Sequence, residues 1–236
     1  MSGRQGQTGL MVRMDAEHGG LLLNFPRHSR AERWADACVH AVGVPAGMIA
    51  AILLLYRAAP AGSALVLASL AIYAFGLVGM LSASAAYQLA RPSRRKEWLR
   101  RADRSMIYVM IAGTYTPISI NVLYGHGGLW LCGLLWLLAC IGIMLTWRFP
   151  RRFERTGFAL YMIMGWMLVL LLKNCMAVLP GDILALIISG GLAYTIGAAI
   201  FKAMPKFYNS IWHTLVLCGA ALQYAAISLQ LTGHIG

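Results

Sequence analysis

Acidic residues are scarce in this sequence, which has 8 Asp and Glu against 20 Lys and Arg among 236 residues. Charged residues make up only 12% of the chain, whereas a soluble domain carries about 25%. The sequence also lacks a nucleotide-binding glycine loop, a nucleophile elbow and a calcium-binding loop. The low charge excludes an ordinary soluble domain. Without these motifs, the sequence offers no support for a nucleotide-dependent enzyme or an α/β-hydrolase.

Cysteines are few, and none of them forms a paired motif. They stand singly in or beside apolar segments, at Cys38, Cys132, Cys140, Cys175 and Cys218. The spacing is that of neither a zinc knuckle nor a redox dithiol. We therefore expect them to be small, buried hydrophobic residues.

Long apolar segments dominate what is present. Hydrophobic residues form 59% of the chain, and the mean hydropathy is +0.66. A helix needs about 20 apolar residues to cross a bilayer, and seven segments meet that length. We predict an all-α membrane protein, a seven-helix transmembrane domain over 31–236 behind a polar tail over 1–30. The predicted helices are 35–56, 63–90, 104–123, 127–147, 157–174, 182–202 and 210–231.

The basic residues orient this bundle, because Lys and Arg accumulate in cytoplasmic loops. All of them except Arg57 and Lys173 precede the first segment or fill alternate loops. This pattern predicts a cytoplasmic N-terminus and an external C-terminus. The apolar run Leu21–Leu23 is too short for a signal-peptide core. We expect the net charge of +12 to contact anionic lipid headgroups, and we expect no nucleic-acid binding.

Three polar side chains fall at one membrane depth near the basic end of the bundle: Ser84, Asp103 and His213. Ser84 precedes Arg91 by about 10 Å of helix. Gln88 lies one turn after Ser84, and Asn209 one turn before His213, so each pair shares a helix face. Polar groups inside a membrane are costly and usually mark a site. The sequence therefore predicts that three helices bring these groups into one pocket.

The first segment adds Glu32, Asp36 and His40 at four-residue intervals, which places them on one stripe of a helix. We expect the stripe to face the bundle interior, where it can meet Asp103 or His213. The alternative is that Glu32 and Asp36 pair with nearby arginines as interfacial charges.

Structural roles also explain the other polar residues. Asp103 suits the N-cap of the third helix. His213 can be a hydrogen-bonded residue between packed helices, and a serine such as Ser84 is ordinary at such contacts.

The run from Asp103 to Pro117, DRSMIYVMIAGTYTP, resembles the third-helix signature of the hemolysin III family, the bacterial branch of the progestin and adipoQ receptor superfamily. The remaining similar stretches span the other helices except the fourth. They are ERWADACVHAVG at 32–43, SASAAYQ at 82–88, LYMIMGW at 160–166, GGLAYTIGA at 190–198 and SIWHTLVLCGAALQY at 210–224. The resemblance implies seven helices, a cytoplasmic N-terminus, a bacterial inner membrane and a zinc site near the cytoplasmic face.

The family pattern places a serine, an aspartate and three histidines around that zinc. Here Ser84, Asp103 and His213 match the pattern, whereas Gln88 and Asn209 stand where the other two histidines belong. A neutral amide is a weak zinc ligand, and oxygen ligands suit harder ions such as Mg²⁺, Ca²⁺ or Mn²⁺. An intact three-histidine zinc site is therefore absent.

A rearranged metal site that uses Asp36, His40, Asp103 and His213 stays open on the sequence. We expect a degenerate polar pocket that binds membrane lipids or is non-catalytic. The alternative is a metal-dependent hydrolase of lipid-like amides such as ceramides, with Asp103 positioning the attacking water and Ser84 hydrogen-bonding nearby. Membrane lysis, which rests on the family's name alone, ranks last.

Overall fold

The computed structural model describes residues 28–60, 63–149 and 152–232, and within these ranges it contains helices and no strand. The all-α prediction is confirmed for this part of the chain, while most of the predicted tail over 1–30 lies outside it. The helices are α1 (Arg30–Ala58), α2 (Ala64–Leu89), α3 (Arg94–Asn121), η1 (Tyr124–His126), α4 (Gly128–Arg148), α5 (Glu154–Gly165), η2 (Met167–Leu171), α6 (Leu172–Val178), α7 (Gly181–Ala203) and α8 (Tyr208–Thr232).

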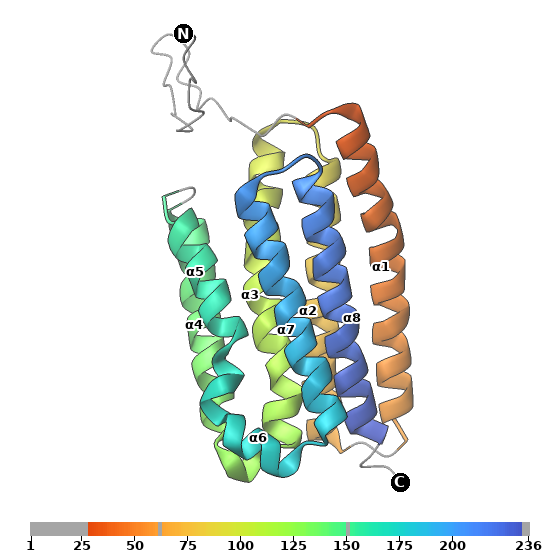
Figure 1. Ribbon diagram of the computed structural model, residues 1–236, viewed down its shortest axis with the longest axis vertical. Coiled ribbons are helices and arrows are strands. Elements are labelled where there is room, and N and C mark those ends of the chain that lie inside the picture. Colours follow the sequence, from red (N-terminus) through yellow and green to blue (C-terminus); the bar gives the residue numbers. More distant parts are fainter. Residues whose placement is uncertain (1–27, 61–62, 150–151, 233–236) are drawn as a thin grey trace.

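The long helices lie roughly along one axis, with α1 at one edge of the bundle and the α4–α5 pair at the other (Figure 1). The chain runs up and down, so the start of α1, the end of α2 and the starts of α3 and α8 share one end (Figure 1). That end carries most of the basic residues, and we call it the basic end. The polar residues that the sequence predicts for the site therefore all lie near the basic end of the bundle.

Six segments of the described chain are long and apolar enough to cross a membrane. They are Arg30–Ala58, Ala64–Leu89, Gly128–Arg148, Arg155–Val178, Gly181–Ala203 and Tyr208–Gln230. Large apolar side chains such as Trp34, Phe75 and Leu137 are exposed on their outer surfaces, as expected of helices that face lipid. The chain is an integral membrane protein.

The helix missing from this set is α3, which contacts α2, α4, α5 and α8. Its second half buries the polar residues Thr114, Thr116 and Ser119. The hydroxyls of Thr114 and Thr116 donate to backbone carbonyls one turn earlier, at 2.8 Å each. Because α3 contacts protein on several sides, it carries more polar residues than a lipid-facing helix does.

The third helix begins ten residues earlier than predicted. Ser93 is its N-cap and accepts a hydrogen bond from the backbone N–H of Lys96 at 3.2 Å, and Glu97 adds an acidic group to the first turn. The prediction that Asp103 opens the helix is therefore wrong. Three extra turns extend α3 at the basic end and place Asp103 within the helix.

The predicted helix over 157–174 is interrupted. Helix α5 ends at Gly165, a 3₁₀ segment follows over Met167–Leu171, and α6 resumes at Leu172. Non-helical backbone at membrane depth needs partners from the surrounding protein. The hydroxyl of Tyr115 on α3 supplies two of them, because it donates to the carbonyl of Gly165 at 2.7 Å and accepts from the N–H of Leu168 at 3.2 Å.

Close helix contacts depend on glycine. A Cβ on Gly76 of α2 would lie 3.2 Å from Cα of Met110 on α3, and a Cβ on Gly190 of α7 would lie 2.9 Å from Gln223 of α8. The absence of these Cβ atoms lets α2 approach α3, and α7 approach α8, closely.

The expectation that the cysteines are buried is only partly confirmed. Cys132 and Cys175 are buried, whereas Cys38, Cys140 and Cys218 are exposed. A membrane protein accepts small apolar residues on its outer surface because that surface meets lipid rather than water.

Candidate functional site

The N-terminal cap of α1 positions the site residues that follow it on this helix. Ser29 and Glu32 form a capping box, in which the backbone N–H of Glu32 donates to Ser29 Oγ at 3.2 Å and that of Ser29 donates to Glu32 Oε2 at 2.8 Å. This cap fixes the first turn of the helix. Asp36 and His40 follow one turn apart, and both are buried. Glu32 also accepts a hydrogen bond from the backbone N–H of Phe207 at 3.2 Å, so it ties α1 to the loop before α8.

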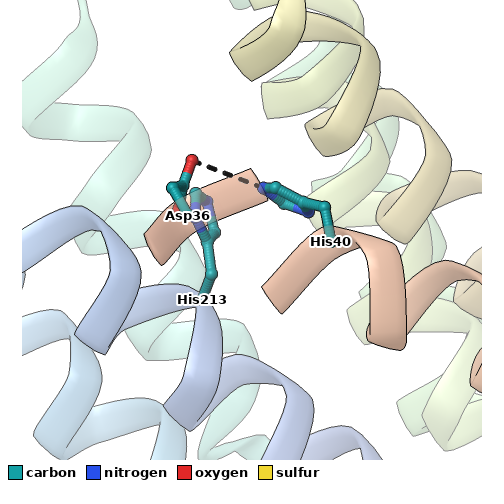
Figure 2. A group of neighbouring side chains, drawn as sticks. All are labelled: Asp36, His40 and His213. Atoms are coloured by element: carbon teal, nitrogen blue, oxygen red, sulfur yellow. Dashed lines mark hydrogen bonds and ion pairs between the residues drawn. The ribbon is translucent and has the colours of Figure 1, made fainter. Parts of the chain in front are cut away.

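Asp36 lies at the centre of a hydrogen-bonded cluster between α1 and α8. Its Oδ1 lies 2.6 Å from Nδ1 of His213, and its Oδ2 accepts a hydrogen bond from Nδ2 of Asn209 at 3.1 Å. Figure 2 shows the side chains of Asp36, His40 and His213 directed toward one another from the two helices. The predicted stripe on α1 therefore faces the bundle interior at Asp36 and His40, and it meets His213 there.

His213 uses its second ring nitrogen as well. Nε2 lies 3.3 Å from Oγ of Ser84 on α2. A carboxylate only accepts hydrogen bonds, so we assign the ring proton to Nδ1, which leaves Nε2 of the neutral ring as an acceptor for the Ser84 hydroxyl. Asp36, His213 and Ser84 thus form a continuous chain across three helices.

His40 is the least satisfied member of the cluster. Its Nε2 lies 3.7 Å from Asp36 Oδ2, and it is buried without a hydrogen-bond partner among the described residues. Its ring centroid lies 4.6 Å from that of His213. A buried nitrogen in this state has the capacity to bind a ligand.

The cluster borders a cavity of about 400 Å³ between the helices. His40, Ser84, Gln88, Asp103, Asn209 and His213 all line it, whereas Asp36 and Glu32 do not. Apolar residues such as Met80, Ile111, Val216 and Leu217 form much of the remaining wall. The structure therefore brings Ser84, Asp103 and His213 to one cavity.

The extension of α3 adds lining residues that the sequence interpretation missed, among them Lys96 and Arg100. Nζ of Lys96 donates to the carbonyl of Ala90 at 2.9 Å and lies 5.1 Å from the centroid of the Tyr87 ring. The sequence interpretation assigns Lys96 and Arg100 to a basic loop that reports only on topology, although Ser93 and Glu97 mark the start of a helix there.

The donor set allows a test of whether a metal fits. Gln88 and Asn209 present amides, and the amide of Asn209 is engaged by Asp36. By contrast, Asp36, His40 and His213 each offer a ligand atom, and these atoms lie within 4.8 Å of one another. One carboxylate and two imidazoles are a ligand set that Zn²⁺ accepts. The donor set of Asp36, His40 and His213 thus fits a metal ion. The set of Gln88, Asn209 and His213, which occupies the family's histidine positions, does not.

Comparison with known proteins agrees with this architecture. The model of the haemolysin-III-related family matches residues 29–224. The chain is 33% identical to a hemolysin-3 homolog of Bacillus subtilis (strain 168) over 83% of this chain and 92% of that protein. It is 31% identical to hemolysin-3 of Bacillus cereus over 83% and 90% of the two chains.

A more distant similarity reaches the human monocyte to macrophage differentiation factor, at 28% identity over 66% of this chain and 67% of that protein. No solved structure matches the chain. The family match covers α1 to α7 in full and α8 as far as residue 224, so it includes all the residues of the cluster. The chain belongs to the haemolysin-III-related family of integral membrane proteins.

Proposed function

We propose that this protein binds a single lipid-like molecule in the cavity, with its polar head at the basic end and its apolar chain among the helices. The cavity carries the proposal. Its volume of about 400 Å³ falls within the range of small-molecule sites, which are mostly apolar with a few polar groups that fix the ligand's orientation.

The cavity lining divides by chemistry. Ser84, Asp103 and His213 offer hydroxyl, carboxylate and imidazole groups toward the basic end, whereas Ile111 lies about two turns further along α3 than Asp103, and Leu217 one turn further along α8 than His213. A molecule with a hydrogen-bonding head and a hydrocarbon chain matches both regions. The surrounding bilayer is the source of such a molecule.

We further propose that seven helices span the bilayer, with α3 as the seventh and α5 to α6 as one interrupted span. The basic end then faces the cytoplasm, and the membrane is a bacterial inner membrane, where anionic headgroups meet the basic residues. An alkaline phosphatase domain fused after Gly236 tests this orientation. We expect enzyme activity outside the cytoplasm, and an inactive fusion that is produced at the same level contradicts the orientation.

The binding proposal is tested by filling the cavity. Gly191 lines it, and a Cβ there meets only the Trp166 ring at 3.8 Å, so Gly191→Phe occupies ligand space. Gly133→Phe is the matched control, because an added Cβ at Gly133 meets nothing within 4 Å and Gly133 does not line the cavity.

Native mass spectrometry of the protein released from mild detergent measures bound lipid. We expect about one tightly held molecule per chain in the unmodified protein and in Gly133→Phe, and a loss of most of it in Gly191→Phe. Equal retention in the two variants contradicts the proposal.

A second candidate function is metal-dependent hydrolysis of a lipid-like amide. The observation that favours it is the group of Asp36, His40 and His213, in which the buried Nε2 of His40 has no hydrogen-bond partner among the described residues. A zinc ion held there would act as a Lewis acid. The protein's own contribution is to hold the ligand's head beside Ser84 and Asp103.

Metal analysis of the purified protein separates the two candidates. The second candidate requires about one zinc per chain, and requires its loss in His40→Ala. The double change Gln88→His and Asn209→His restores the family's histidines. Zinc that appears only in this double variant supports a native cavity without metal.

A further inference from the structure

We propose that Ser84, His213 and Asp36 form a catalytic triad that hydrolyses an ester of a single-chain lipid. Ser84 is the nucleophile, His213 is the general base and Asp36 is a positioning residue. This inference rests on the proposed binding of a lipid-like molecule in the cavity.

The connectivity of the hydrogen bonds carries the argument. Asp36 Oδ1 holds Nδ1 of His213 at 2.6 Å, and Nε2 of the same ring lies 3.3 Å from Ser84 Oγ. A serine triad requires this order, in which the carboxylate binds one ring nitrogen and the hydroxyl binds the other. The longer of the two distances is ordinary for a serine and its base when no substrate is bound.

The positions of the three residues relative to the cavity agree with the roles assigned to them. Ser84 and His213 line it, so they can touch a bound molecule, whereas Asp36 does not line it. Asp36 is also held from its other oxygen, because Nδ2 of Asn209 donates to Oδ2 at 3.1 Å. The carboxylate is thereby fixed against His213 and shielded from the substrate.

Donors for a developing oxyanion are available beside the nucleophile. His40 lines the cavity and its ring lies 4.6 Å from that of His213. Its buried Nε2 has no hydrogen-bond partner in the described chain and lies 3.7 Å from Asp36 Oδ2. Gln88 lines the cavity one turn after Ser84 on α2. An imidazole N–H and an amide NH₂ are both donors that stabilise such an oxyanion.

The reaction balances with water as the only co-reactant. The bond from Ser84 Oγ to the ester carbon forms while Nε2 of His213 takes the hydroxyl proton. The bond from that carbon to the alcohol oxygen then breaks, and His213 returns the proton to the departing alcohol. A water molecule from the basic end attacks the acyl group on Ser84, again with His213 as base, and releases the fatty acid and the free serine.

The triad and a metal ion compete for the same ring. Both nitrogens of His213 are engaged, so a metal ion bound by His213 would displace either Asp36 or Ser84. Added Zn²⁺ is therefore expected to inhibit a reaction of Ser84, whereas it would activate a metal-dependent hydrolase.

The test is covalent labelling of the full-length protein in native membranes with dodecyl fluorophosphonate, followed by peptide mapping. In this reaction Ser84 Oγ bonds to phosphorus, its proton passes to Nε2 of His213, and fluoride leaves. We expect one adduct, on Ser84, which Ser84→Ala abolishes and 1:1 Zn²⁺ suppresses. Ser82→Ala is the matched control, because Ser82 lies on the same helix at nearly the same depth but does not line the cavity.

The role of Asp36 is tested by separating rate from binding. Asp36→Asn keeps the shape of the side chain, so we expect the probe's half-saturation concentration to change little. The maximal labelling rate should fall roughly 100-fold to 10,000-fold, because a mis-oriented base loses that much. A structural role for Asp36 alone would alter binding and stability without this selective loss of rate.

A dodecyl phosphonate diester without fluoride distinguishes failure of the triad from failure of binding. If this diester raises the thermal unfolding temperature while Ser84 remains unmodified by the fluorophosphonate, the triad is wrong and the binding proposal stands. If neither compound interacts with the cavity, both proposals are overturned. Labelling that is equal in wild type and Asp36→Asn also contradicts the triad.

Discussion

Replacing Asp36 by alanine tests how strongly the cluster ties α1 to α8. The carboxylate is the acceptor for Nδ1 of His213 at 2.6 Å and for Nδ2 of Asn209 at 3.1 Å. Asp36→Ala leaves both donors without this acceptor inside the bundle. The orphaned Nδ1 of the buried His213 costs about 1–3 kcal/mol, and the half-buried amide of Asn209 adds less because water can reach it. The free energy of unfolding should therefore fall by at least about 1–3 kcal/mol.

A graded series sharpens this expectation. Asp36→Asn keeps one acceptor oxygen and should lose about half as much stability. Asp182→Ala is the control, because Asp182 is an exposed acidic residue in the first turn of α7, where the interaction with the helix dipole is worth about 0.3–1 kcal/mol.

Unfolding of the purified protein in mixed micelles, by titration with sodium dodecyl sulfate, measures these differences. The reasoning is refuted if Asp36→Ala unfolds within 1 kcal/mol of the unmodified protein, or if it matches Asp182→Ala. Either result would mean that the cluster forms without stabilising the contact between α1 and α8.

The same titration checks three further predictions. Tyr115→Phe should destabilise by about 1–3 kcal/mol for each backbone group that it orphans at the break after α5, whereas Tyr124→Phe, at an exposed tyrosine, should change little; equal effects would contradict the role of the Tyr115 hydroxyl. Gly76→Val should cost about 1–3 kcal/mol by forcing α2 from α3, and a neutral result would show that these helices are not in close contact. Ser29→Ala removes the cap of α1 and should cost about 1 kcal/mol; no loss would argue against the capping box.

The sequence predicted the helices well because hydrophobicity and basic loops report directly on a membrane fold. The six apolar spans all fall within predicted segments or their immediate extensions. The start of α3 was misplaced because its first turns carry basic residues, and these were interpreted as a loop. Ser93 and Glu97 are an N-terminal helix signal that could have corrected the boundary.

The only local sequence cue for the break between α5 and α6 is Gly165, the last residue of α5, and a single glycine does not by itself end a helix. Residues 166–171, WMLVLL, are apolar, contain neither glycine nor proline and are compatible with a continuous helix. The partner that satisfies the broken backbone, Tyr115, is distant in the chain and belongs to α3. A tertiary contact of this kind does not alter the hydrophobic periodicity of the sequence, so periodicity cannot predict it.

The sequence predicted which residues lie in the site, but it did not predict which of them contact one another. Helical spacing indicated that Asp36 and His40 share a face and that His213 lies at a matching depth. It gave no basis for choosing between Asp103 and His213 as the partner of Asp36. The structure pairs Asp36 with His213, and this depends on the packing of α1 against α8, which only the assembled bundle determines.

The central claim is that a lipid-like molecule enters the cavity with its head at Ser84 and His213. Photolabelling in native membranes with a long-chain lipid that carries a diazirine beside its head group tests this most directly. The account predicts adducts on the peptides that contain Ser84 and His213, reduced by excess unlabelled lipid. Labelling confined to outward residues such as Phe75 and Leu137, and insensitive to competition, would contradict it.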